Sequence, residues 1–112
     1  MKLKLITKAI EKATPPLYSN ENKKSSDIMV TAKFFNPYGA AVWYMTEYDP
    51  QTKTAFGYCD LGFGSPELGY FSLTEMEEIR IKPFGFKIER DRYFTPIPLQ
   101  TVLNHYDERK EQ

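Results

Sequence analysis

Residues 28–61 contain three strand-like runs joined by two short turns, and this pattern limits the possible folds more than any other part of the sequence. In the run 28–35, IMVTAKFF, apolar side chains recur at every second position, as in a strand. The turn NPYG has the residue preferences of a type I turn, and DPQT begins with Asp-Pro. We therefore expect a three-stranded antiparallel meander that ends with the run 53–61. Its central strand is the run 40–48, which is apolar on both faces until Glu47.

Three other segments are expected to form helices. Residues 6–13 carry apolar side chains on one helical face, with Thr7 as the N-cap and the prolines 15–16 ending the helix. The sequence SLTE at 72–75 is a capping box that starts a short helix. Residues 99–106 have apolar side chains at i, i+3, i+4 and i+7, which predicts a C-terminal helix.

These elements predict one α+β domain over residues 1–112. Its antiparallel sheet holds the meander of three strands plus one or two more, for which ELGYFS at 67–72 and FKIERDRYF at 86–94 are the candidates. The N- and C-terminal helices and the short internal helix pack on this sheet. We expect residues 19–27, SNENKKSSD, to be a mobile loop, and residues 107–112 to be a frayed tail.

Composition excludes several classes of function. The formal net charge is zero, so the chain has no overall field that would attract DNA or a membrane. The charges are uneven, however: residues 1–33 hold seven lysines and three acids, a net +4, and residues 34–112 carry a net −4. A solvated helix face and a polar loop account for the lysines, and a local nucleic-acid patch is the alternative. Seventeen aromatic residues favour a sheet-rich core with some aromatic surface.

Cysteine usage and hydropathy indicate the compartment. Cys59 is the single cysteine, so no intramolecular disulfide forms, and a reducing environment fits. No apolar run is long enough to cross a membrane, and the start MKLKLITKAI lacks the features of a signal peptide. We expect a cytoplasmic protein that does not bind membranes, and its oligomeric state stays open.

The stretch GFGSPELGYFS at 62–72 contains three glycines, but its spacing is wrong for a nucleotide-binding loop. A dinucleotide fingerprint needs its third glycine three residues after the second, whereas Gly69 lies five residues after Gly64. No glycine precedes Lys-Ser or Lys-Thr, which excludes a P-loop. We therefore expect no cofactor, and expect Gly62 and Gly64 to take positive φ in a turn. Glu67, in an otherwise apolar stretch, could bind a cation or act as a base, but we favour a structural role in which it accepts backbone N–H bonds and fixes the loop.

The stretch IERDRYF at 88–94 is the densest charge cluster. On a strand, Glu89 and Asp91 share one face, and Arg90 and Arg92 share the other. The carboxylates could flank a metal ion, and the arginines beside aromatic rings could hold phosphate or stack on bases. Charges of both signs also protect an edge strand from aggregation, which is the interpretation we favour.

Catalytic arrangements have little support in the sequence. His105 is the single histidine, so a Cys59–His105 dyad would require the fold to bring the two together, and a zinc site lacks ligands. A magnesium site would need at least three carboxylates to converge from the set Asp60, Glu67, Glu89 and Asp91. We expect none of these.

The tyrosines leave two interpretations open. Trp43 and Tyr44 point to opposite faces of a strand, so we expect one in the core and one near the surface. If four tyrosines shared an exposed face, they would form a binding platform, but we favour a core position for them: Tyr44, Tyr48, Tyr58 and Tyr70.

Two longer motifs, PELGYFSLTEMEEIR at 66–80 and IERDRYFTPIPL at 88–99, carry a family resemblance. Together with TPPLYSNE at 14–21 and VTAKFFNPYGAAVWYMTEYDP at 30–50, they resemble the bacterial family called domain of unknown function 2958. The resemblance covers roughly residues 3–103. It implies a small single-domain protein encoded on plasmids and integrative elements, near genes that handle DNA, and it supplies no activity and no catalytic residues.

We expect a non-catalytic accessory protein of a mobile genetic element that binds another protein. The candidate binding residues are Glu67, Tyr70, Glu89, Arg90, Asp91 and Arg92, on an aromatic patch formed by 62–71 and 89–94. The alternatives are nucleic-acid binding, through the lysine-rich first third with Arg90 and Arg92, and a metal-dependent hydrolase.

Overall fold

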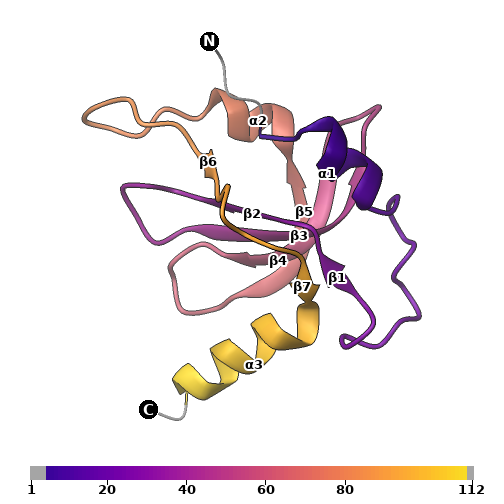
Figure 1. The fold of residues 1–112 in the computed structure, drawn as a ribbon. Coiled ribbons are helices and arrows are strands. Elements are labelled where there is room, and N and C mark those ends of the chain that lie inside the picture. Colours follow the sequence, from indigo (N-terminus) through magenta and orange to yellow (C-terminus); the bar gives the residue numbers. More distant parts are fainter. Residues whose placement is uncertain (1–4, 111–112) are drawn as a thin grey trace.

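The computed structural model describes residues 5–110, which form an α+β domain (Figure 1). A five-stranded antiparallel sheet has the strand order β5-β4-β3-β2-β6, and a separate pair joins β1 to β7. Helices α1 and α2 lie on one side of the large sheet and α3 lies beyond the other side (Figure 1). The elements are α1 (Lys8–Ala13), β1 (Met29–Val30), β2 (Ala32–Phe35), β3 (Val42–Asp49), β4 (Thr54–Asp60), β5 (Glu67–Ser72), α2 (Leu73–Glu78), β6 (Glu89–Arg90), β7 (Ile97–Pro98) and α3 (Leu99–Lys110).

The predicted meander and α+β class are confirmed. Strands β2, β3, β4 and β5 follow one another as antiparallel neighbours, and β3 is the central strand of the five. The loop after β4 turns through two glycines in the left-handed region, Gly62 with φ 89° and Gly64 with φ 82°. This turn brings β5 back along β4.

The helix ends also follow the expected chemistry. The Thr7 side chain accepts a hydrogen bond from the Ile10 amide at 3.1 Å, and Ser72 accepts one from Glu75 at 3.2 Å. Helix α3 continues to Lys110, beyond position 107 where we expected a frayed tail to begin. Residues 111–112 of that tail lie outside the described residues, and the fraying stays a prediction.

Residues 19–27 form a series of turns rather than a regular element. The Asp27 amide donates to the Lys24 carbonyl at 2.8 Å, which closes one turn. The Ser25 carbonyl accepts a bond from the Gln100 amide at 3.1 Å, so this segment also caps the start of α3. The mobility of the segment stays a prediction.

The prediction of one strand over 28–35 is wrong, because the run breaks at Thr31. The Thr31 amide donates to the Met45 carbonyl at 2.9 Å, and Ala32 is also paired with Met45, so two residues oppose one. Such an extra residue reverses the alternation of faces. Val30 consequently packs on the α3 side of the sheet, whereas Phe34 packs on the side of α1 and α2.

The prediction of a strand over 86–94 is also wrong in length, because only Glu89 and Arg90 form β6. The Asp91 carboxylate accepts a hydrogen bond from the Tyr93 amide at 2.9 Å and starts a turn. The strand therefore ends before Asp91 and Arg92. As a result, the expected strand with two carboxylates on one face and two arginines on the other does not form. The position of β6 at a sheet edge agrees with the edge-strand interpretation.

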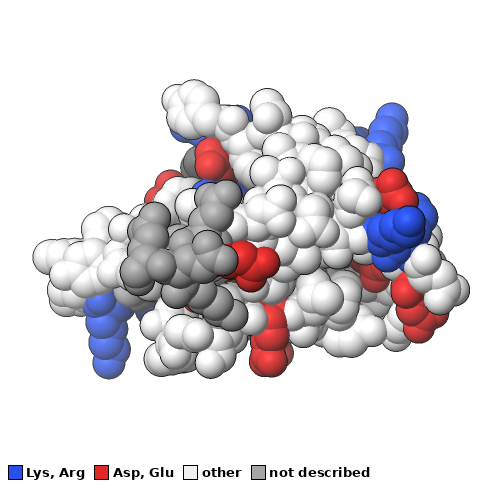
Figure 2. Space-filling model, turned by 90° about the horizontal axis from the view of Figure 1, so that it is seen from below, with Lys and Arg blue, Asp and Glu red and all other residues white. Residues whose placement is uncertain are grey.

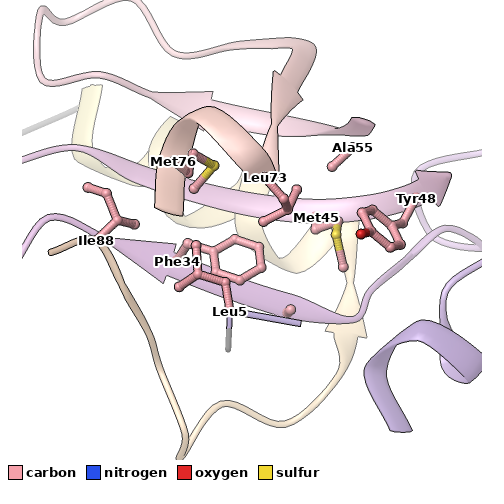
Figure 3. Packing of buried hydrophobic residues seen from close by; sticks show 9 residues of the cluster. Leu5, Phe34, Met45, Tyr48, Ala55, Leu73, Met76 and Ile88 are labelled. Carbon is pink, nitrogen blue, oxygen red and sulfur yellow. The ribbon is translucent and has the colours of Figure 1, made fainter. Parts of the chain in front are cut away.

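The large sheet is covered on both faces by separate apolar clusters. The upper core lies between the sheet and α1 and α2 (Figure 3), and the lower core lies between the sheet and α3. Each buried Leu or Phe side chain stabilises the fold by about 1.5–3 kcal/mol. The upper core consists of Leu5, Ala32, Phe34, Met45, Tyr48, Ala55, Leu73, Met76 and Ile88, and the lower core of Val30, Tyr44, Leu99, Val102 and Tyr106.

A second bulge lies in the central strand, at Thr46. The β3–β4 register shifts between Met45 and Glu47, and the Thr46 hydroxyl donates to the Phe56 carbonyl at 3.1 Å. Beside this bulge, Gly57 lies opposite Met45, and a Cβ at Gly57 would overlap the backbone of Tyr44. The bulge therefore requires glycine at position 57.

We predict that Gly57→Ala destabilises the fold by about 1–3 kcal/mol, because the added methyl group forces two backbones apart. The matched control is Gly69→Ala, directly across the β4–β5 pair, where a Cβ meets nothing within 4 Å. We expect the control to change stability by less than about 1 kcal/mol. Urea denaturation measures both, and equal midpoints for the two variants would contradict the close approach.

Candidate functional site

The candidate site is built on a buried carboxylate in the central strand. Glu47 is 4 % exposed and lies opposite Phe56, on the α3 side of the sheet. Its two oxygens accept hydrogen bonds from the backbone amides of Tyr18, at 3.0 Å, and Asn20, at 2.8 Å. A buried charge is stable only with such partners. Glu47 thereby fixes the segment 18–20 against the sheet.

Tyr18 is held in an uncommon backbone conformation at this point. Its φ is 72°, in the left-handed region that costs a non-glycine residue about 1–3 kcal/mol. The hydrogen bond to Glu47 offsets this strain, and the Asn20 side chain adds a bond to the Thr46 carbonyl at 3.3 Å. The result is a tyrosine ring that is 62 % exposed and lies edge-on to Tyr70, with 6.4 Å between ring centroids.

Strand β5 continues this exposed area. The Tyr70 ring also contacts Phe56, at 4.9 Å between centroids, and Tyr70 and Leu68 remain 55 % and 50 % exposed. We call Tyr18, Phe56, Leu68 and Tyr70 the β5 apolar surface. These four residues, with Glu21, Ile28, Leu99 and Glu47 among others, line a hollow of about 360 Å³, the Glu47 hollow. Grouped exposed side chains of this kind mark interaction sites more often than single ones do.

The opposite face of the same strand borders a second hollow. Glu67 and Gly69 point to this face, because each lies opposite a β4 residue, Cys59 or Gly57, that faces the side of α1 and α2. The hollow has a volume of about 350 Å³, and we call it the Trp43 hollow. Its lining includes Trp43, Cys59, Leu61, Phe63, Glu67, Gly69 and Tyr70. Strand β5 therefore has a hollow on each of its faces.

The six residues expected to form the site lie at two opposite edges of the sheet. Glu67 and Tyr70 are on β5, whereas Glu89 and Arg90 are on β6, and Asp91 and Arg92 follow it. Four strand spacings separate the edges, about 19 Å at about 4.8 Å each. The structure therefore does not join 62–71 and 89–94 into one patch.

The four residues at the β6 edge have different surroundings. One guanidinium nitrogen of Arg90 donates to the Leu5 carbonyl at 3.0 Å, which ties the N-terminal segment to the sheet. The Asp91 carboxylate accepts a hydrogen bond from the Tyr93 amide, and Glu89 and Arg92 are exposed. Their role in binding stays a prediction.

The carboxylates of the hydrolase hypothesis do not converge. Asp60 and Glu67 belong to β4 and β5, and Glu89 and Asp91 lie at the far edge of the sheet. Between residues 5 and 110, no three His, Cys, Asp or Glu side chains are placed to hold a metal ion together. The hypothesis required at least three to meet, so this observation removes its structural basis.

Cys59 and His105 lie on opposite sides of the sheet. Cys59 is paired with Trp43, which packs on the upper core, whereas His105 neighbours Tyr106 of the lower core on α3. Burial, with a smaller effect from Glu67, raises the pKa of the Cys59 thiol to about 11. A neutral thiol is a poor nucleophile, so the structure contradicts the dyad.

A third hollow, of about 550 Å³, lies beside α3 and the loop after β4. Tyr106 lines it and is hydrogen-bonded to Asp60 and Tyr44, and burial raises the pKa of Tyr106. The Asp60 carboxylate also accepts the Gly62 amide at 2.9 Å. These polar groups satisfy one another, which indicates a structural role for them.

The four tyrosines do not share one face. Tyr44 belongs to the lower core and Tyr48 to the upper core, because the bulge at Thr46 lies between them. Tyr58 is half-buried against Tyr106, and Tyr70 alone of the four is an exposed residue. The favoured core interpretation is therefore right for Tyr44 and Tyr48 and wrong for Tyr70.

Sequence reasoning missed two residues of the site. Glu47 is the single acid between residues 28 and 48, and a lone carboxylate in a central strand could have indicated a buried partner for backbone amides. Tyr18 gave no comparable signal, since its conformation depends on a hydrogen bond to a residue 29 positions away.

We predict that Glu47→Ala destabilises the fold by about 3 kcal/mol, because the amides of Tyr18 and Asn20 lose their acceptor. Glu47→Gln keeps one carbonyl oxygen, and we expect about half that loss. Urea denaturation at neutral pH measures both variants. The control is the exposed Glu67→Ala, with a change within about 0.5 kcal/mol. A Glu47→Ala variant as stable as this control would contradict the anchoring role.

We predict that alkylation of Cys59 by iodoacetamide is slower in the native protein than in the unfolded chain at about pH 8. The reason is that burial raises the pKa of the thiol from about 9 to about 11. As the pH rises, the thiol ionises in the unfolded chain before it ionises in the native protein. The free energy of unfolding therefore falls as the pH rises from about 9 to about 11. A native alkylation rate that is half-maximal at or below pH 9 would contradict this environment.

Comparisons with known proteins give one match. A family model described as a protein of unknown function, DUF2958, matches residues 5–110. No curated protein matches the chain. No solved structure matches it. None of the described helices is long and apolar enough to span a membrane.

Proposed function

The chain belongs to the DUF2958 family of proteins of unknown function, and we propose that it is a non-catalytic binding module that holds a partner protein on the β5 apolar surface. The observation that carries this proposal is a group of three exposed apolar side chains, Tyr18, Leu68 and Tyr70, which lie with the partly buried Phe56 beside a hollow. Tyr18 supports it further, because its strained conformation keeps a large ring exposed. Aromatic residues in such positions often anchor protein partners.

The chemistry of the rest of the described chain supports binding over catalysis. The candidate nucleophile Cys59 has a raised pKa and no histidine on its side of the sheet among residues 5–110. The carboxylates considered for a metal site are spread over both sheet edges. From the family resemblance we further propose a cytoplasmic role as an accessory protein of a mobile genetic element.

Nucleic-acid binding has less support on the face that carries α3. Among the described residues drawn on this face, basic side chains lie in separate places, some directly beside acidic ones, and they form no continuous basic stripe (Figure 2). At the β6 edge, Arg90 is engaged with the Leu5 carbonyl. Lys2 and Lys4 of the lysine-rich first third lie outside the described residues. Binding through that segment stays a prediction from the sequence.

We predict that the double variant Leu68→Ser/Tyr70→Ser loses binding to its partner by at least about tenfold, since truncating a central anchor costs about 2 kcal/mol. The probes are the purified products of the neighbouring genes, and titration calorimetry measures each affinity. The matched control is Tyr93→Ser, which truncates a 91 % exposed ring near the opposite edge.

The control should bind as the wild type does, and circular dichroism should show native spectra for all variants. The proposal fails if no neighbouring gene product binds the wild type at micromolar concentration. It also fails if the double variant binds as tightly as Tyr93→Ser. Binding of single-stranded or double-stranded DNA that weakens steeply with salt, without any protein partner, would favour the nucleic-acid alternative.

A further inference from the structure

We infer that the partner contributes an extended segment, with apolar and basic side chains, that pairs with β5 as an added strand of the sheet. This inference rests on the proposed function and states how the partner would bind. Three features of β5 carry it: the direction of its backbone groups, the two hollows, and the charges around them.

The backbone groups of Leu68 and Tyr70 point away from β4. The Leu73 amide donates to the Lys53 carbonyl at 2.9 Å, so Leu73 and Lys53 are a hydrogen-bonded pair. In the antiparallel register that follows, hydrogen-bonded pairs alternate with pairs that are not hydrogen-bonded. Residues 71, 69 and 67 therefore bond to β4, and the residues between them face outward. The Phe56 carbonyl supports this assignment, because it points to β3 and accepts a hydrogen bond from the Thr46 hydroxyl, not from Tyr70, which lies opposite Phe56 on β5.

These outward amides and carbonyls form an open edge within the described part of the chain. Strand order places β5 at the end of the sheet, and residues 5–110 supply no further strand beyond it. An exposed edge is a template for another strand unless lysine, proline, a bulge or a short length blocks it. Strand β5 is six residues long and contains no lysine and no proline. The opposite edge strand, β6, has only two residues and both are charged.

The two hollows would receive the side chains of an added strand. Successive side chains of a strand point to opposite faces, and the new strand would lie about 4.8 Å from β5. One set would meet Phe56, Leu68 and Tyr70 at the Glu47 hollow, and the other would meet Trp43 at the Trp43 hollow. Main-chain pairing with alternate side-chain contacts is the usual form of strand addition.

Charges near the edge favour a basic segment. Glu67 is exposed on the Trp43 side of β5, and Glu21 lines the Glu47 hollow, where Lys23 is the single lysine among the lining residues. A hydrogen bond with Tyr18 is the main cause that raises the pKa of Tyr70, burial adds to it, and the nearby carboxylates of Glu47 and Glu21 make smaller contributions of the same sign. A partner strand that alternates apolar residues with Lys or Arg matches this surface.

The test begins with a phage-displayed library of random linear peptides selected on the immobilised wild-type protein. The enriched peptides are synthesised, and their affinities are measured by fluorescence anisotropy. We expect sequences that alternate apolar residues with Lys or Arg. Hydrogen exchange followed by NMR should show that bound peptide slows exchange of the Leu68 and Tyr70 amides, while the amide of Tyr93 exchanges unchanged.

Two variants separate backbone pairing from side-chain contact. Leu68→Pro removes a backbone amide that points away from β4, so no hydrogen bond between β5 and β4 is lost. We expect the fold to persist, because proline is tolerated at such edge positions. It should weaken peptide binding by at least about tenfold through the lost hydrogen bond and the blocked approach. Leu68→Ala keeps the amide and should weaken binding less.

The outcomes distinguish failure of the inference from failure of the proposed function. Peptides that bind equally to Leu68→Pro and Leu68→Ala, without protecting the Leu68 and Tyr70 amides, would overturn strand addition. If the same peptides still lost affinity for Leu68→Ser/Tyr70→Ser, the binding surface would stand. A library that yields no peptide for the wild type would count against both. A wild-type dimer that Leu68→Pro separates would overturn the choice of partner, because a second copy would then occupy the edge.

Discussion

The contact between the Glu47 carboxylate and the amides of Tyr18 and Asn20 is the interaction on which the α3 side of the molecule depends. Burial of the Glu47 carboxylate in the central strand would be costly without hydrogen-bond partners. The two amides supply these partners, and the same bonds hold a segment without regular structure in place. The same segment then bonds to the first turn of α3 through Ser25. One side chain thus links the middle of the sheet, the connection before β1 and the start of the last helix.

Much of the fold was predictable from local patterns, because its turns and caps are determined by near neighbours. The NPYG and DPQT turns, the Thr7 and Ser72 caps and the stripe of α3 all depend on residues within a few positions of each other. The central place of β3 followed from apolar side chains on both faces. These features predicted the α+β class, the three helices and the order of the meander strands, but not the separate β1–β7 pair.

The errors about which face a side chain occupies arose where one strand has an extra residue opposite its partner strand, whereas β6 is short because of the local turn at Asp91. The bulges at Thr31 and Thr46 exchange the two faces of their strands, and neither is encoded in the alternation itself. The distance between Glu67 and Glu89 likewise depends on strand order, which the local pattern leaves open. The structure therefore places Glu67 and Tyr70 on β5 and separates them from the residues of the β6 edge, so the single surface that we expected does not form. Binding by either group of residues stays a prediction.

The unequal edges of the sheet have a consequence for assembly. One border is a long strand with open backbone groups, and the other is a two-residue strand with charged side chains and a turn directly after it (Figure 1). A sheet with two open borders can grow without limit, as fibrils do. In the described part of the chain, only one border of the large sheet is long enough to pair with another strand. Pairing of β5 between two copies would use both long borders, so that assembly would stop at two copies and would not grow into a filament.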